Sequence, residues 1–572
     1  MRTATVCLTA SLLVGTALPA RAAATASPRI DATFTPHVGA SGKADGVAIR
    51  YVAQGLIPGK PLDLQWDLLA PSPGRSTDEV QALMVRDRRG VLALHSTTDD
   101  AAGMRHYVSD RAPVGAVTVQ YRVPVAMAIP PDGRGPHREM QAAGNGITTS
   151  GDGFLLLPAW KGTITLQAHW NLPKGFSASS SFGDGDFTAT RDIADILDAF
   201  YVAGTLRRFP GPDGAQGFNA AGLGRTDIDL QALFSWSAQD YDIVRQAFGG
   251  AKGHSFRAFY RSYDGGRPDS GRANGDGILL YLMPRHTEAD ALFDKKSLMA
   301  HEIVHVWQPR MAAEDGEDTL WFTEGSANYY AAVLPFEHGL MTAAEYAVLI
   351  NQYAMEYYGN ALRNIPNADI PNKMWSAPDA WTIPYDRGAL YFADLDARVR
   401  SHSAGKTTLL DLLKAFAALR KAGKPHGPKA WRALVEAEAG PEAAAAFDAM
   451  LTGKTILPAA GAFGPCVQAR ALQIGVFDLN YRKKKGTNVI ETVLPGSNAE
   501  KAGLQVGDTL AGNADLEPAF TDLDRAVAIP IRRNGVKMTV RYVPRYGSVE
   551  AMRWEPVNTP ACAARSVAIG EK

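Results

Sequence analysis

The spacing of hydrophobic and polar residues changes along the chain, and each change predicts a different kind of structure. Between about residues 28 and 185, apolar and polar positions alternate in short runs such as 46–52 and 163–170, separated by clusters of Pro, Gly and Asp. A period of two is typical of β-strands that bury one face. We therefore expect a β-rich domain of the sandwich or barrel type in this region.

Helical patterns that alternate with short strands follow from about residue 190. Ser237 is expected to cap one helix, and Asp294 is expected to cap another that ends before Pro309. The next helix is expected to run from near Thr323 to about Val333. This region therefore predicts a domain that mixes helices and strands.

A third pattern extends over residues 388–457, which are rich in Ala and Leu at helical spacing. It predicts a helical subdomain, preceded by a helix that opens with a capping box of Thr342 and Glu345. Patterning typical of strands returns from about residue 467. The whole chain is therefore expected to be a multidomain α+β protein.

Composition and charge narrow the class of protein. Hydrophobic residues make up 46% and charged residues 21% of the 572 residues, which excludes a disordered or collagen-like chain. The 59 basic and 59 acidic residues give a formal net charge of +0. A balanced chain has no broad attraction for nucleic acid or an anionic membrane surface, so we expect neither as a partner.

The first 24 residues have the pattern of a secretory signal peptide. Arg2 precedes an uncharged apolar run over residues 6–18, and small residues flank Arg21 at a cleavage site. The alternative, a membrane anchor, needs about 20 apolar residues, and this run is shorter. We expect a periplasmic or secreted protein without a membrane span.

The cysteines predict one disulfide bond. Cys7 lies in the expected signal peptide, which leaves Cys466 and Cys562 in the mature chain. Outside the cytoplasm, two remaining cysteines favour a bond with each other, and this bond would enclose the C-terminal segment.

A metal-binding pattern lies on the helix expected after residue 294. His301 and His305 are four residues apart, so their imidazoles share one helix face and can bind one metal ion. Glu302 lies beside the first histidine, where a carboxylate can take a proton from a metal-activated water. The pattern predicts a hydrolytic zinc site with Glu302 as general base.

Glu324 is the expected third ligand. The 18 residues 306–323 separate it from His305, a length that allows two packed helices to bring the three side chains together. Two His and one Glu leave the fourth position of one Zn²⁺ open for water. The alternative is a pair of buried histidines and a glutamate that is favoured by the helix dipole.

These residues resemble a known family. His301, Glu302, His305 and Glu324 together resemble the gluzincin metallopeptidases, and residues 320–325 with the tyrosine pair 329–330 are similar to the glycyl aminopeptidase family. Residues 384–389 resemble the segment that carries the catalytic tyrosine in relatives of aminopeptidase N. The resemblance implies that Tyr385 donates a hydrogen bond to an oxyanion, whereas the alternative is an ordinary half-buried tyrosine.

The resemblance covers about residues 150–545 and implies a domain order. After the signal peptide (1–24) we expect a β-sandwich-like domain (25–190), a thermolysin-like catalytic domain (191–390), a helical subdomain (391–460) and a PDZ-like domain (466–562).

The C-terminal module is identified by residues 493–508, which resemble a bacterial PDZ domain. This resemblance implies that an extended peptide can add a strand to an edge of the module. The alternative is a structural appendage that packs on the catalytic domain.

One family feature has no clear counterpart. Aminopeptidase N relatives anchor the substrate amine with a carboxylate on a strand, and in residues 282–288 only Glu288 offers one. An acidic run at Glu314, Asp315, Glu317 and Asp318 could instead contact an amine or a second cation, or be a solvated loop.

The expected function is a secreted zinc metallopeptidase that acts on peptides, with aminopeptidase action favoured. An endopeptidase with the same mechanism remains open because the amine anchor is missing. A catalytically inactive peptidase scaffold that serves as a PDZ adaptor is the third alternative, although an inactive scaffold has no need of Glu302.

Overall fold

The computed structural model describes most of the chain. It describes residues 27–68, 80–125, 140–210, 217–251, 256–262, 269–274, 277–286, 291–313, 319–374, 380–484, 486–516 and 518–562. The expected signal peptide, Glu288 and the acidic run 314–318 lie outside these residues. No helix within the described ranges is both long enough and apolar enough to cross a membrane.

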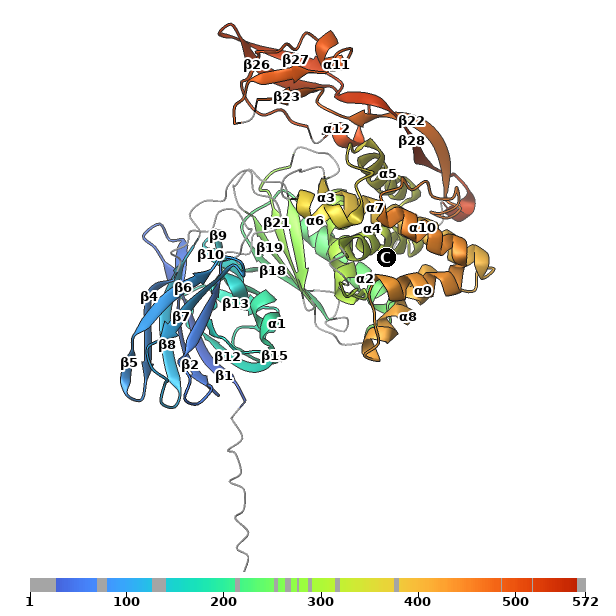
Figure 1. Cartoon of the computed structure of the whole chain (residues 1–572). Coiled ribbons are helices and arrows are strands. Elements are labelled where there is room, and N and C mark those ends of the chain that lie inside the picture. Colours follow the sequence, from blue (N-terminus) through green and yellow to red (C-terminus); the bar gives the residue numbers. More distant parts are fainter. Residues whose placement is uncertain are drawn as a thin grey trace, which may run out of the picture.

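The N-terminal part is built from β-sheets, which confirms the expected β-rich domain (Figure 1). A seven-stranded sheet contains, in order, β15 (Phe187–Asp192), β12 (Thr163–Trp170), β1 (Arg29–Val38), β2 (Ala44–Gln54), β8 (Val117–Pro124), β4 (Gln81–Asp87) and β5 (Gly90–Leu92). A four-stranded sheet contains β11 (Leu157–Pro158), β3 (Asp63–Asp67), β7 (Met104–Ser109) and β6 (Leu94–Asp99). Buried residues alternate with more exposed ones along most of β12, as the sequence pattern of residues 163–170 predicts for a strand with one face in the core.

A third sheet connects this part to the rest of the molecule. It contains β14 (Gly183–Asp184), β13 (Ser177–Ser180), β16 (Phe200–Gly204), β10 (Gly146–Ser150) and β9 (Gln141–Ala143). Phe200 and Val202 of β16 pack with Phe259 and Leu279 of the following sheet in one buried cluster. The β-rich part and the next domain therefore share a hydrophobic interface.

The following sheet is mostly parallel and is covered on both faces. Its order is β17 (Arg207–Pro210), β18 (Phe218–Leu223), β19 (Phe256–Ser262), β21 (Gly277–Leu282) and β20 (Ser270–Asn274). The strands β18, β19 and β21 run parallel, and β20 is an antiparallel edge strand. Every residue of β21 is buried, because the β-rich part covers one face and helices cover the other.

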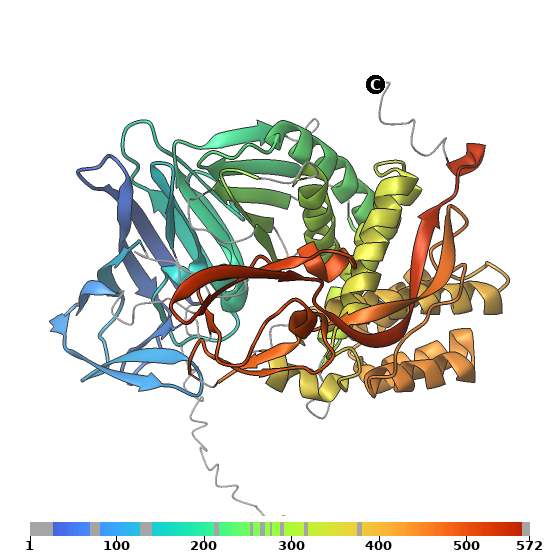
Figure 2. The same ribbon diagram turned by 90° about the horizontal axis from the view of Figure 1, so that it is seen from above.

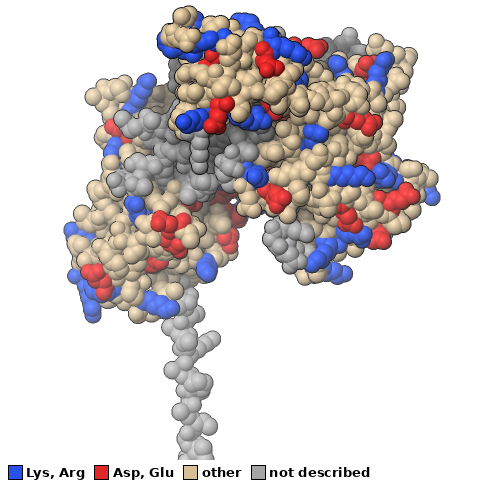
Figure 3. Space-filling view, turned by 45° about the horizontal axis from the view of Figure 1, so that its top comes forward, with Lys and Arg blue, Asp and Glu red and all other residues tan. Residues whose placement is uncertain are grey.

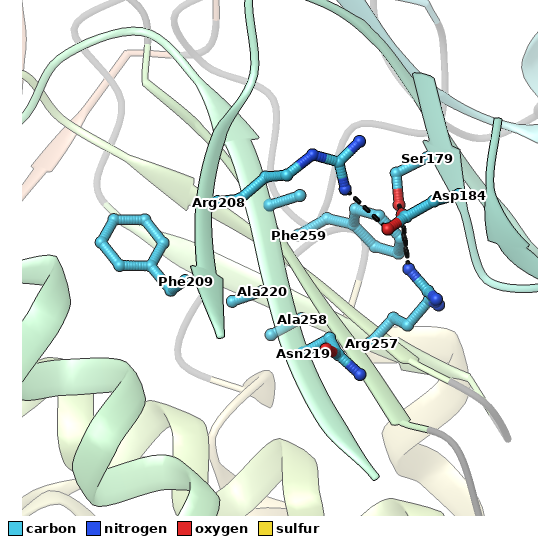
Figure 4. Close-up of a pocket in the computed structure, with 10 residues that line it drawn as sticks. Ser179, Asp184, Arg208, Phe209, Asn219, Ala220, Arg257, Ala258 and Phe259 are labelled. Atoms are coloured by element: carbon cyan, nitrogen blue, oxygen red, sulfur yellow. Dashed lines mark hydrogen bonds and ion pairs between the residues drawn. The ribbon is translucent and has the colours of Figure 1, made fainter. Parts of the chain in front are cut away.

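An ion-pair cluster also joins the two parts at this interface. Figure 4 shows Arg208 of β17 and Arg257 of β19 reaching Asp184 of β14. The distances from the guanidinium nitrogens to the carboxylate oxygens are 2.8 Å and 2.7 Å, and the Ser179 hydroxyl donates to the same carboxylate at 2.6 Å. These contacts line a small cavity of about 170 Å³.

Three helices next to the sheet begin or end differently from the sequence expectation. Helix α2 (Leu230–Ala247) is capped by Asp229, and Ser237 lies inside it with its hydroxyl bonded to the Leu233 carbonyl. Helix α3 (Ala291–Trp307) begins before Asp294, which lies in its first turn. Helix α4 (Leu320–Glu337) starts earlier than expected and continues through Pro335, because a proline in the last turn removes only one hydrogen bond.

The helical region that follows is confirmed. It contains α5 (Ala343–Gly359), α6 (Ile370–Met374), α7 (Ile383–His402), α8 (Leu409–Lys421), α9 (Pro428–Ala439) and α10 (Pro441–Leu451). The predicted capping box of Thr342 and Glu345 is present at the start of α5. Figure 1 shows α8, α9 and α10 on the side of α4 and α7 that lies away from the N-terminal sheets.

The C-terminal part begins and ends in one long two-stranded ribbon. Strands β22 (Val467–Phe477) and β28 (Arg545–Pro556) pair antiparallel, and both pack on α5. Between them lies a small unit of β23 (Tyr481–Lys483), β24 (Ile490–Val493), α11 (Asn498–Lys501), β25 (Thr509–Leu510), α12 (Pro518–Thr521), β26 (Val527–Arg533) and β27 (Val536–Tyr542). This unit has its own hydrophobic core, and Figure 2 shows it in front of the rest of the molecule.

Cys466 and Cys562 are paired at the base of this ribbon, with Cα atoms 5.5 Å apart. Both are buried in the main core rather than in the core of the small unit, so the pair joins the two ends of the ribbon where the ribbon packs against the helical region.

The surface agrees with the balanced composition. On the face drawn in Figure 3, acidic and basic side chains are interspersed with wide uncharged areas.

Candidate metal centre

The two histidines of α3 and the glutamate of α4 converge at one point. The Nε2 atoms of His301 and His305 are 3.0 Å apart, and each lies 3.3 Å from Oε2 of Glu324. The three residues form a group whose ligand atoms all lie within 4.8 Å of one another. The structure thus brings together the three ligands that the sequence predicts.

The spacing of these atoms fits a zinc ion. Bonds of about 2.0–2.1 Å in a tetrahedral site place neighbouring ligand atoms about 3.3 Å apart. The observed separations of 3.0–3.3 Å match this value. Two imidazole nitrogens and one carboxylate oxygen are also the donor set of a catalytic zinc site, which leaves one position open.

Two further side chains orient the histidines, and the sequence analysis missed both. Oδ1 of Asn328 lies 2.7 Å from Nδ1 of His301, so it can accept the Nδ1 proton and leave Nε2 free for a metal. The Gln308 side-chain amide lies 2.5 Å from Nδ1 of His305 and is itself bonded to Ser326. If the Gln308 amide is rotated by 180°, its oxygen takes the place of its nitrogen and can accept a proton from Nδ1 of His305. Asn328 follows Glu324 by four residues, a spacing that could have revealed it.

Glu324 is held in its charged form by its neighbours. Burial alone would raise its pKa, but hydrogen bonds and charge interactions with His301 and His305 lower the pKa below its usual value. A permanently ionised carboxylate is the form that a cation requires as a ligand.

Glu302 lies between the three ligands and the edge strand β20, and it interacts electrostatically with His301, His305 and Glu324. Its side chain is buried, and burial raises the pKa of its carboxyl above the usual value. The backbone N–H of Ala273 donates a hydrogen bond to it. A Cβ atom added to Gly271 would lie 3.2 Å from Cγ and Oε1 of Glu302, so this strand packs directly against the carboxylate.

Tyr385 also lies at the centre. It belongs to the first turn of α7, and its ring stacks on that of His301 with centroids 5.8 Å apart. Its hydroxyl forms a hydrogen bond with Glu324, and burial raises its pKa well above the usual value. The phenol therefore keeps its proton and can act as a hydrogen-bond donor.

A close crossing of α4 and α7 fixes Tyr385 relative to Glu324. A Cβ atom on Gly325 would lie 2.5 Å from Cα of Gly388, and one on Gly388 would lie 2.4 Å from the Trp321 carbonyl oxygen. Neither glycine can be replaced without moving a helix, because real Cβ atoms do not approach backbone so closely.

The centre opens into a cleft of about 930 Å³. Residues of β20, α3, α4, α5 and α7 line it, among them Arg272, Lys295, Tyr353, Glu356 and Asp386. The volume lies within the range of about 300–1,000 Å³ that is usual for ligand-binding clefts.

The strand beside Glu302 is not the segment 282–288 in which the sequence analysis looked for an amine anchor. Residues 282–286 lie at and beyond the end of β21, the neighbour of the edge strand β20, and β20 lines the cleft instead. The positions of β20 nearest Glu302 are Gly271 and Ala273, and neither carries a carboxylate. No sequence motif identified β20, because only its pairing with β21 places it there.

Comparisons with known proteins support the same type of centre. Residues 294–382 match the model of the M61 glycyl aminopeptidase family, which confirms the family resemblance in the segment that contains the three ligands. A search among curated proteins gave no match.

Solved structures are similar in fold. An aminopeptidase N family protein from Idiomarina loihiensis superposes with a TM-score of 0.67 at 15% identity, over 93% of this chain and 99% of that one. An M1 zinc metallopeptidase from Deinococcus radiodurans gives a TM-score of 0.48 at 16% identity, over 76% of this chain and 95% of that one. The first similarity shows that the chain has an aminopeptidase-like fold.

Proposed function

We propose that this protein is a zinc-dependent peptidase with one Zn²⁺ held by His301, His305 and Glu324. The observation that carries the proposal is the convergence of their three ligand atoms at the separations of a tetrahedral zinc site. The family match over residues 294–382 and the aminopeptidase-like fold support a peptidase rather than another hydrolase.

Each nearby side chain has a role in this proposal. Zinc, when bound, acidifies a water molecule and polarises a carbonyl group. Glu302 takes a proton from the attacking water and passes it to the leaving amine, and its burial suits a base whose pKa lies above that of a free carboxylate. Tyr385 donates a hydrogen bond to the oxygen on which negative charge develops.

Aminopeptidase action is the favoured reaction because of the family match. Endopeptidase action is a second candidate, and the observation that favours it is the lack of a carboxylate on β20 beside Glu302. The complete set of His301, Glu302, His305, Glu324 and Tyr385 argues against an inactive scaffold.

The remaining sequence predictions belong to the same proposal. We propose that the protein is periplasmic or secreted, that Cys466 and Cys562 are oxidised to each other, and that the domains follow one another in the expected order. The expected boundaries at 190/191 and 390/391 fall inside β15 and α7, so they need to shift to the ends of these elements. The separate core of the small unit between β22 and β28 supports a PDZ-like domain, and peptide binding by it is proposed from the sequence resemblance alone.

One experiment tests the central proposal. The purified protein is analysed for metal and then assayed on peptides with free and with acetylated N-termini. We expect about one zinc per chain, as a site with three protein ligands predicts, and hydrolysis that a chelator abolishes and zinc restores. Cleavage of free peptides alone indicates an aminopeptidase, cleavage of both indicates an endopeptidase, and cleavage of neither contradicts the proposal.

A further inference from the structure

One wall of the cleft contains a buried carboxyl group that the proposed reaction does not use. Asp386 lies in the first turn of α7, directly after Tyr385, and only 2% of its surface is exposed. It nevertheless lines the cleft. One of its oxygens, Oδ2, is buried without a hydrogen-bond partner among the described residues. A buried polar atom that lacks a partner usually marks a place where a ligand, ion or water completes the contact.

A second carboxylate approaches the same place from α5. Glu356 is half-buried, lines the cleft and accepts a hydrogen bond of 3.1 Å from the Gln352 amide on the same helix. Burial and the negative charge of Glu356 raise the pKa of Asp386 well above its usual value. The two carboxyl groups therefore repel each other when both are ionised.

A positively charged group would offset both the missing hydrogen bond at Asp386 and the repulsion between the two carboxylates. It would supply donors to the unpartnered oxygen of Asp386 and would cancel the repulsion from Glu356. Two cationic side chains of the cleft are engaged elsewhere, because Lys295 pairs with Asp269 at 2.6 Å and Arg272 pairs with Asp198 at the end of α1 (Ile193–Asp198). Neither is committed to the α5–α7 wall.

Strand β20, on the opposite side of the cleft, carries no carboxylate. The positions of β20 nearest Glu302 are Gly271 and Ala273, which have no charged group. Of the described carboxylates beside the strand, Glu302 has a role in the proposed reaction and Asp269 pairs with Lys295. The α5–α7 wall offers Glu356 and Asp386 instead.

We propose that Glu356 and Asp386 form a subsite for a positively charged group of the substrate, an ammonium or a guanidinium. The group can be the N-terminal amine of the peptide or a basic side chain, since both have the same chemistry. This inference rests on the proposed peptidase function, and it assigns the recognition of charge to helices rather than to the edge strand.

Binding of four hydroxamates to the zinc-loaded protein tests the subsite without requiring turnover. Lysine hydroxamate and norleucine hydroxamate differ only in the side-chain cation, and the Nα-acetyl form of each lacks the α-amine. Dissociation constants are measured by calorimetry for the wild type, Asp386→Asn and Glu356→Gln. Because Asp386 is buried and its variant can fail to fold, the half-buried Glu356 supplies the second test.

We expect the wild type to bind at least one cationic form about tenfold or more tightly than its neutral counterpart, the usual value of a charge-assisted hydrogen bond. Both variants should lose this preference and keep their affinity for Nα-acetylnorleucine hydroxamate. If acetylation removes the preference, the bound group is the α-amine. If lysine hydroxamate binds more tightly than norleucine hydroxamate, the bound group is the cationic side chain.

The matched control is Asp294→Asn, which removes one negative charge from the α3 side of the same cleft and should keep the preference. Equal binding of all four compounds, or a preference that survives in both Asp386→Asn and Glu356→Gln, overturns the subsite. Zinc content is measured on the same samples. A protein that binds no zinc contradicts the proposed function, whereas zinc-dependent binding without charge preference contradicts only the subsite.

Discussion

The two sides of the cleft are built in different ways. On the helix side, His301, His305 and Glu324 come from α3 and α4, which are consecutive helices within one short stretch of chain. The rest of the cleft is lined by β20 on one wall and by α5 and the start of α7 on the other, with residues from positions 270 to 386. The metal-binding side therefore depends on local spacing, and the substrate-binding side depends on tertiary packing.

This difference predicts two kinds of mutant behaviour. Changes on the helix side should remove activity toward every substrate, because they remove the metal or the proton acceptor. Changes on the other side should alter rate or substrate preference while zinc remains bound.

The largest effect is expected for His305→Ala. Loss of one of three protein ligands should reduce zinc from about one per chain to a trace and abolish peptide hydrolysis. Metal analysis after dialysis measures the effect, and His402→Ala, an exposed histidine at the end of α7, is the control. Full zinc occupancy in the variant would show that His305 is not a ligand.

Glu302→Gln should keep zinc and the fold but lose the base. We expect kcat to fall by about a hundredfold or more, since an amide cannot accept the proton. Steady-state kinetics with zinc analysis measure the change, and Glu442→Gln, an exposed residue of α10, is the control. Turnover close to that of the wild type would assign the proton transfer to another group.

Tyr385→Phe tests the residue that joins the two sides, since it lies on α7 and contacts His301 and Glu324. We expect kcat to fall by about a hundredfold with little change in KM, because the hydroxyl acts mainly in the transition state. Tyr546→Phe, half exposed on β28, is the control. A change confined to KM would instead place Tyr385 in substrate binding.

Gly271→Ala tests the strand side. The new Cβ would lie 3.2 Å from Glu302 and push its carboxylate by a few tenths of an ångström. A misplacement that costs about 1 kcal/mol would lower kcat about fivefold with zinc retained. Gly461→Ala, where nothing lies within 4 Å of the added atom, is the control. Unchanged kinetics would mean that β20 yields to the new side chain.

The smallest effect on hydrolysis is expected from reducing the bond between Cys466 and Cys562. The bond closes a loop with a sequence separation of 96, and such a loop contributes up to about 4–5 kcal/mol in the chain-entropy model. Melting of the ribbon β22–β28 should therefore shift to lower temperature, while small-peptide hydrolysis keeps about half or more of its rate. Calorimetry measures the melting temperature and kinetics measure the rate of hydrolysis, each with and without a reductant. Cys466→Ser is the control, because it cannot form the bond and a reductant should not change it further. A complete loss of activity would show that the ribbon holds α5 in place.

The sequence predicted those features that depend on neighbours in the chain. The strands with alternating burial, the capping box of α5 and the helix with two histidines were all identified correctly. Helix starts were less accurate, because Ser237 can cap a helix or bond within one, and Pro335 is tolerated near a helix end. Local sequence does not distinguish these states.

The parts of the site that were missed depend on packing across the chain. The strand β20 is placed only by its pairing with β21, and the role proposed for Asp386 depends on Glu356 on another helix. The contact of Gln308 with His305 spans only three residues, whereas that of Asn328 with His301 spans 27 and depends on the packing of α4 against α3. An amide near a ligand in sequence is common and does not by itself indicate a role.

The glycine crossing of α4 and α7 has a consequence for motion. Because Gly325 and Gly388 bring the two backbones into direct contact, no side chain at this point can change rotamer and let the helices slide. We therefore expect the backbone segments that carry Glu324 and Tyr385 to move together through a catalytic cycle. If the cleft opens to admit a peptide and closes around it, β20 and α5, the helix against which the C-terminal ribbon rests, are free of this constraint.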